Sequence, residues 1–97
     1  MIVAEFSTIP MGMGTSASEY VLAIHEILRE SGVKFVPGPM STSIETNSFE
    51  QLFEIIEKAN RKLAEMGVQR IITSIHIDYR RDLNISIESK LHKLIEK

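Results

Sequence analysis

The sequence predicts a single α+β domain in which helices pack against one face of an antiparallel sheet. Segments rich in β-branched and aromatic residues alternate with segments of helical periodicity, in the order βαββαβ, and a short amphipathic segment follows. The links between these segments are short. The 97 residues suffice for one hydrophobic core and leave too little chain for a second. We therefore expect one domain that spans residues 1–97.

The first strand is predicted at residues 2–9, where β-branched and aromatic residues dominate. Pro10 fixes φ and lacks the backbone N–H that a sheet ladder requires, so we expect the strand to end before it. The loop that follows contains Gly12 and Gly14, which allow the backbone to turn freely.

The first helix is predicted from Ser16 to about Ser31. Ser16 and Glu19 form an S-x-x-E capping box, and Gly32 is placed to end the helix in the left-handed conformation. Helical spacing assigns one apolar face to Tyr20, Ile24, Ile27 and Leu28.

A hairpin and a second helix are predicted next. Strands at residues 33–36 and 40–46 flank a turn made by Pro37, Gly38 and Pro39. Ser48 and Gln51 repeat the capping-box spacing, and Gly67 marks the end of the helix. One buried stripe is expected at Phe49, Leu52, Phe53, Ile56, Leu63 and Met66.

The last strand is predicted at residues 69–79, followed by a charged loop and a short terminal helix. That helix carries its apolar residues at Ile87, Leu91, Leu94 and Ile95. The complete order matches the ferredoxin-like split βαβ arrangement. It implies an antiparallel sheet with strand order 4-1-3-2, two main helices on one face and an open face opposite.

Three threonines interrupt the apolar side of this sheet. Period-two alternation directs Thr8, Thr42 and Thr73 toward the helices, and antiparallel pairing brings them to the sheet end where the first helix begins. Together with Tyr20 and Met40 they describe a small apolar pocket with a few polar anchors. The alternative is that threonine is simply a good strand residue whose hydroxyl bonds locally.

The opposite face mixes polar and apolar side chains. Alternation assigns to it Val3, Glu5, Ser7, Ile9, Ser41, Ser43, Glu45, Ile72, Ser74 and His76. This composition fits neither a core nor a charged solvent-exposed face. It suits a sheet-to-sheet contact between subunits, with ordinary exposure as the alternative.

Composition and motifs argue against several classes of function. A net charge of −2 provides no cationic field for nucleic acid, and no apolar run is long enough to cross a membrane. With no cysteine and with His25, His76 and His92 far apart in the pattern, no metal site and no cysteine nucleophile emerge. The first residues lack the pattern of a secretory signal. We expect a cytoplasmic, non-enzymatic protein without a cofactor.

The segments IPMGMGTSASEYV, MSTSIE and TSIHIDYRRD resemble those of the small thiamine-binding protein family, which is related to the YkoF-like proteins. The resemblance extends from Ile2 to about Lys93. It implies a ferredoxin-like fold that associates through its sheets into dimers or tetramers. The family motifs fall on Ile9, Pro10, Gly12, Met40, Thr42, Ile44, Glu45, Thr73, Ile75, Ile77, Asp78 and Arg80. Met11 and Met13 depart from the smaller residues often found in that loop.

The resemblance implies binding of thiamine or its hydroxymethylpyrimidine part, as a carrier, buffer or sensor, without turnover. The ligand residues that we predict are Thr8, Ile9, Tyr20, Met40, Thr42 and Thr73, with Gly12 and Glu45 as further candidates. Glu45 could balance the thiazolium charge, although alternation puts it on the opposite face, where a structural role is equally expected. The alternative function is a purely oligomeric interaction module.

Overall fold

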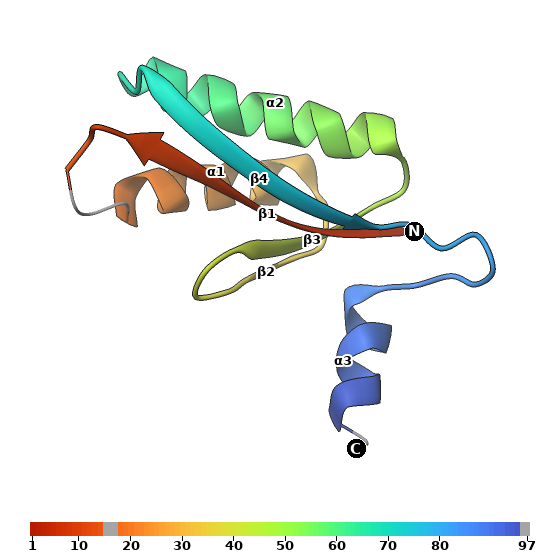
Figure 1. Cartoon of the computed structure of the whole chain (residues 1–97). Coiled ribbons are helices and arrows are strands. Elements are labelled where there is room, and N and C mark those ends of the chain that lie inside the picture. The colour runs from red at the N-terminus through yellow and green to blue at the C-terminus, as the bar shows by residue number, and fades with distance from the viewer. Residues whose placement is uncertain (15–17, 96–97) are drawn as a thin grey trace.

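The computed structural model describes residues 1–14 and 18–95. Its elements are β1 (Ile2–Met11), α1 (Ser18–Ser31), β2 (Phe35–Pro37), β3 (Thr42–Thr46), α2 (Phe49–Glu65), β4 (Arg70–Asp78) and α3 (Ile87–Ile95). The four strands form one antiparallel sheet in the order β2-β3-β1-β4. Helices α1 and α2 lie on the same face of that sheet (Figure 1). The predicted ferredoxin-like topology is therefore confirmed, whereas the cap predicted at Ser16 lies outside the described residues.

The hydrophobic core fills the space between the sheet and these two helices. Its buried members are Ile2, Ala4, Phe6, Tyr20, Ile24, Leu28, Ile44, Leu52, Ile55, Ala59, Leu63 and Val68. Ile71, Ile75 and Ile77 of β4 pack against this cluster from the sheet edge. The assignment of alternate residues to the helix-facing side is thus confirmed on β1, β3 and β4.

Strand β1 runs two residues further than the sequence predicts. Pro10 lies inside it, opposite Ile71, and Met11 pairs with Arg70. Since β3 pairs only with residues 2–6, the later part of β1 has a neighbour on one side alone. A proline is tolerated where its missing N–H faces the side without a neighbour.

The ends of α1 and α2 follow the predicted signals. Gly32 and Gly67 have φ values of +74° and +95°, the left-handed region in which glycine closes a helix. Ser48 caps α2 by accepting a hydrogen bond from the Gln51 N–H at 3.1 Å. The Gln51 side chain accepts from the Asn47 N–H rather than from the cap residue itself.

The buried stripe of α2 is narrower than the sequence predicts. It consists of Leu52, Ile55, Ala59 and Leu63. Phe49 and Phe53 are 38% and 51% exposed, so their predicted burial is wrong. Their rings contact each other, and Phe49 also packs edge-on against Tyr79 with 5.1 Å between ring centroids. The helix is apolar over a wider arc than the sheet can cover.

The face of the sheet opposite α1 and α2, which we call the outer face, is not fully open. The chain after β4 returns beneath it, so that Ile85 and Ile87 bury Val3 in a second small apolar cluster. The Glu45 carboxylate, buried here, accepts a hydrogen bond from the Ile87 N–H, the first of α3. From this attachment α3 projects away from the sheet (Figure 1).

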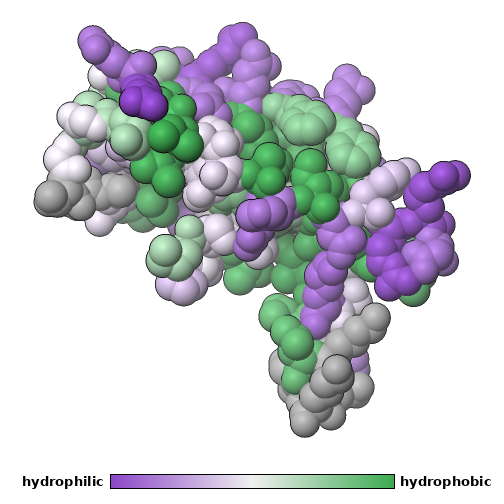
Figure 2. Space-filling model, viewed as in Figure 1, coloured by the Kyte–Doolittle hydropathy of each residue, from purple (hydrophilic) through white to green (hydrophobic). Residues whose placement is uncertain are grey.

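The rest of the outer face keeps the predicted mixture of side chains. Figure 2 shows apolar atoms over β1 and β4 interrupted by polar ones, and more apolar surface on α3. The Glu5 carboxylate accepts a hydrogen bond here from the Ser41 hydroxyl at 3.0 Å, and its other oxygen lies 3.1 Å from Nδ1 of His76. No helix among the described residues combines the length and the apolar character needed to cross a bilayer.

Candidate functional site

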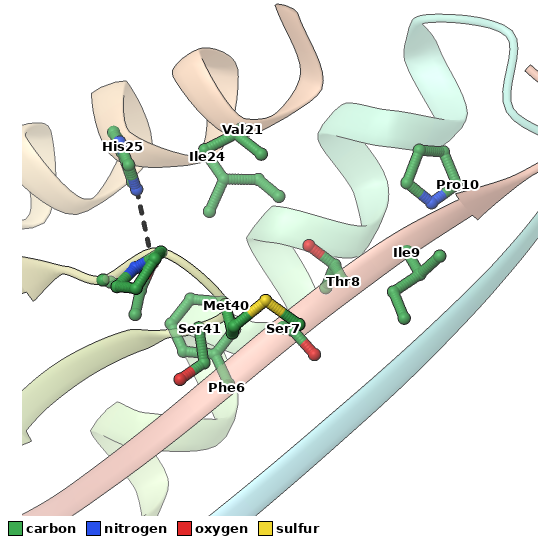
Figure 3. Close-up of a pocket in the computed structure, with 13 residues that line it drawn as sticks. Phe6, Ser7, Thr8, Ile9, Pro10, Val21, Ile24, His25, Met40 and Ser41 are labelled. Atoms are coloured by element: carbon green, nitrogen blue, oxygen red, sulfur yellow. Dashed lines mark hydrogen bonds between the residues drawn. The ribbon is translucent and has the colours of Figure 1, made fainter. Parts of the chain in front are cut away.

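A cavity of about 230 Å³ opens between β1, α1 and the β2–β3 turn, which we call the β1–α1 pocket (Figure 3). Its walls come from residues far apart in the sequence. They are Phe6, Ser7, Thr8, Ile9 and Pro10 of β1, Val21, Ile24 and His25 of α1, and Gly38, Pro39, Met40, Ser41 and Thr42 at the turn and the start of β3.

The pocket exists because β3 is short. It pairs with β1 only as far as Phe6, and beyond that point the β2–β3 turn replaces a strand beside β1. The turn is tight: the Gly38 N–H donates to the Ser41 carbonyl at 2.9 Å. A Cβ at Gly38 would lie 2.6 Å from that same carbonyl oxygen, so any larger residue would force the turn to shift. Glycine is therefore needed for this wall of the pocket.

Thr8 contributes a hydroxyl that the fold leaves without a partner. The residue is 9% exposed, and its Oγ1 is the one buried side-chain oxygen or nitrogen among the described residues that forms no hydrogen bond. Figure 3 shows this oxygen on the side of β1 that faces the helices. A buried polar atom without a partner costs about 1–3 kcal/mol. A ligand that bonded Thr8 would offset that cost.

The second polar wall combines Thr42 with His25. The Nε2 atom of His25 lies 3.2 Å from the Thr42 Oγ1, which joins α1 to the start of β3 across the pocket. The His25 ring also contacts Phe35, with 5.7 Å between centroids. Partial burial, and after it the charge of Arg29, lower the pKa of His25 below its usual value of 6.5. The imidazole is accordingly neutral at pH 7.

Four of the six predicted ligand residues lie around this one pocket: Thr8, Ile9, Met40 and Thr42. Met40 is 87% exposed and lies at the rim. The other two predicted residues are not among those that line it. Tyr20 is buried in the core, and Thr73, although it pairs with Thr8 in the sheet, donates its hydroxyl hydrogen bond to Asn60 of α2 at 3.1 Å.

The two further candidates also lie elsewhere. Gly12, with φ +78°, borders a separate hollow at the end of the sheet with Met11, Met13 and Arg70. Glu45 lies on the outer face, where its carboxylate holds the start of α3. Of the two roles considered for Glu45, the contacts match the structural one.

His25 lines the pocket although it is not among the ligand residues predicted from the sequence. It follows Ile24 and lies four residues after Val21, at the border of the buried face of α1. That border position was readable from helical periodicity. The sequence does not predict how α1 is rotated about its axis, because that depends on how the helix packs. This rotation brings the border position close to the β2–β3 turn.

The lining of the β1–α1 pocket combines apolar walls with a few hydroxyl groups. His25 is its one titratable side chain, and the remaining lining is apolar or carries hydroxyl groups. The volume falls below the range of about 300–1,000 Å³ that is usual for drug-sized ligands. No group of three or more histidine, aspartate or glutamate side chains able to hold a metal ion occurs within residues 1–14 and 18–95.

Comparison with known sequences gives consistent relatives. Residues 4–95 match the family model described as thiamine-binding protein. A UPF0045 protein of Methanothermobacter thermautotrophicus is 34% identical over 98 residues, which span 100% of this chain and 99% of that protein. The UPF0045 protein YqgV of Bacillus subtilis is also 34% identical, over 97% of this chain and 94% of its own length.

Solved structures agree with this assignment. A hypothetical protein from Methanocaldococcus jannaschii superposes with a TM-score of 0.87 at 32% identity and covers 99% of this chain and 97% of its own. A Thermotoga maritima protein described as a candidate for thiamine biosynthesis or salvage gives a TM-score of 0.81 at 25% identity, with 96% and 97% coverage. With a family model that matches nearly its whole length, the chain belongs to the thiamine-binding protein family.

Proposed function

We propose that this protein binds thiamine or its hydroxymethylpyrimidine part in the β1–α1 pocket and acts as a carrier, buffer or sensor. The observation that carries the proposal is the buried, unpartnered hydroxyl of Thr8, a residue that lines that pocket. Buried polar groups are normally satisfied, so an exception in the lining of a cavity is a place where a ligand can supply the partner. The family to which the chain belongs, and the description of the Thermotoga relative, favour thiamine chemistry for that ligand.

The pocket suits the pyrimidine half of thiamine better than the thiazolium half. A flat ring fits between Phe6, Ile24 and the turn, while the hydroxyls of Thr8 and Thr42 can bond its edge. No carboxylate lines the pocket to balance a cation. The thiazolium ring would therefore lie at the rim beside Met40, whose flexible thioether can pack on a heteroaromatic face.

The same lining supports binding without turnover. A nucleophilic mechanism needs a nucleophile, a base and an orienting group in contact. In the pocket, His25 forms a hydrogen bond with the Thr42 hydroxyl, but the lining offers no third group that would orient His25 as a base. We propose that the ligand leaves unchanged, and mass spectrometry after incubation with thiamine should recover it intact.

Association between chains forms the second part of the proposal. The outer face keeps Ile9 and Ile72 side by side and exposed, at 48% and 40%, among hydroxyl and carboxylate groups. Such a surface is suited to a contact with a second copy of the chain, as a homodimer or homotetramer. This contact alone would also explain a protein that had no small-molecule ligand, which is the alternative function.

A thermal shift experiment separates the two functions. A ligand that binds only the folded protein stabilises it by RT ln(1 + [L]/Kd), about 2.7 kcal/mol at a hundredfold excess over Kd. We expect thiamine and hydroxymethylpyrimidine to raise the melting temperature, while uracil, which lacks the amino group, has a smaller effect. No shift with either ligand at millimolar concentration would leave the interaction module as the better account.

A further inference from the structure

His25 occupies a position from which it can control how the β1–α1 pocket bonds its ligand. Its Nε2 lies 3.2 Å from the hydroxyl of Thr42, and both residues line the same cavity. Figure 3 shows His25 on α1 pointing down to the turn, with the bond crossing one end of the pocket. The bond therefore ties a titratable imidazole to the hydroxyl of a residue that lines the ligand space.

The charged surroundings of His25 are sparse. On its own helix, Arg29 is the charged side chain that acts on the ring. The segments of β1 and of the β2–β3 turn that face it across the pocket carry no charge. Lys34, next to the contacting Phe35 in the chain, pairs with Glu88 at 3.8 Å. No carboxylate among the described pocket residues is available to stabilise an imidazolium, which agrees with the lowered pKa of His25.

The protonation state of His25 decides whether its Nε2 is able to accept the Thr42 hydrogen. Only a neutral imidazole with its proton on Nδ1 can accept there, and the lone pairs of Oγ1 then remain free for a donor. An imidazolium can only donate. The Thr42 oxygen then accepts from Nε2, and its own hydrogen turns toward the ligand.

We propose that His25 is a positioning residue that, through Thr42, makes the pocket select an uncharged ring bearing an amino donor. This inference rests on the proposed binding function and names the ligand class for it. Neutral His25 with its proton on Nδ1 leaves the Thr42 oxygen free as an acceptor for the exocyclic amine of an aminopyrimidine. Protonation uses one lone pair of that oxygen, frees the Thr42 hydrogen to face the amine, and adds a positive charge to a pocket without carboxylates. Binding of the amino-bearing ring should therefore weaken as the pH falls.

The test is a titration of hydroxymethylpyrimidine into wild-type protein and variants by calorimetry, from about pH 8 to about pH 5. Because the ligand also titrates in this range, the comparison between variants carries the result. His25→Gln keeps an acceptor for Thr42 but cannot titrate, and His25→Leu removes the acceptor. His76→Gln is the matched control, since His76 is exposed on the outer face and pairs with Glu5.

We expect wild type and His76→Gln to lose at least about tenfold more affinity on acidification than His25→Gln. At pH 8, His25→Leu should bind at least about fivefold more weakly than His25→Gln. Identical pH profiles in wild type and His25→Gln would overturn the role of His25 while leaving the binding function intact. Absence of binding to wild type at pH 8 would instead overturn the binding function. Circular dichroism confirms that each variant is folded, and His25→Asn replaces His25→Gln if the latter is not.

Discussion

At the scale of single residues, Thr8 has a hydroxyl that the folded chain does not use. Thr46, also buried, provides the contrast, because its hydroxyl donates to the Ser48 carbonyl at 3.1 Å. A hydroxyl that serves folding and one that serves a ligand should respond in opposite ways to removal.

We predict that Thr8→Val leaves the fold intact and raises the free energy of unfolding by about 1 kcal/mol, because an unsatisfied buried group disappears at almost constant shape. Thr46→Val should lower it by about the same amount, because a hydrogen bond is lost. Chemical denaturation measures both. Destabilisation of Thr8→Val by the same amount as Thr46→Val would mean that Thr8 has a partner within the fold.

Alternation along the sequence identified Thr8 and Thr42 because side chains of a strand alternate with a period of two. Thr8 lies within β1, and Thr42 is the first residue of β3. It could not separate them from Thr73, which shares their face but has Asn60 of α2 as its partner. Partners on another element depend on helix position, and no local pattern encodes that. His25 was missed for the same reason.

At the scale of elements, α3 is attached to the sheet by few contacts. The Glu45 carboxylate accepts the Ile87 N–H, Lys90 pairs with Asp78 of β4, and Ile85 and Ile87 cover Val3. A carboxylate at a helix N-terminus satisfies a free N–H and interacts favourably with the helix dipole. Glu45 is therefore a structural residue whose loss should loosen α3 first.

We predict that Glu45→Ala lowers the free energy of unfolding by about 1–3 kcal/mol, because the Ile87 N–H loses its buried acceptor. Amide hydrogen exchange should become faster in α3 while the amides of α1 and α2 remain protected. Ligand affinity should not change, since Glu45 lies on the face opposite the pocket. Uniform acceleration of exchange across all helices would show that α3 is not a separate unit.

The element order, the helix cap at Ser48 and the two helix-ending glycines followed from local rules. The width of the buried face of α2 did not. Phe49 and Phe53 are apolar at helical spacing, yet the sheet covers only the stripe through Leu52 and Ile55. Periodicity shows which residues share a face but not how much of that face a neighbour covers.

At the scale of the whole molecule, the two faces of the sheet have separate roles. The helix-facing side holds the core and the pocket, and the outer face holds the surface proposed to meet a second chain. Ile9 belongs to both, because it lines the pocket and is also exposed beside Ile72. Substitutions at Thr42 and at Ile72 are therefore the ones that separate binding from assembly.

We predict that the wild-type protein is a dimer or tetramer in light scattering at micromolar concentration. Ile72→Arg, which puts a charge at the exposed pair with Ile9, should shift the mass toward that of one chain. Leu22→Arg, at a 63% exposed position on α1, is the control and should leave the mass unchanged. A wild-type protein with the mass of a single chain would contradict assembly through the outer face.

Isothermal titration with hydroxymethylpyrimidine tests the central claim most directly, that the β1–α1 pocket binds the ligand. Thr42→Val should retain the fold and bind about 5 to 150-fold more weakly, because a hydroxyl worth about 1–3 kcal/mol to a paired ligand is gone. Ile44→Val, two residues further along β3 in the core, should cost about 0.5–1.5 kcal/mol of stability with nearly unchanged affinity. Saturable binding that weakens in Thr42→Val alone is the predicted result; wild-type affinity in Thr42→Val, or no binding by any of the three proteins, would contradict the account.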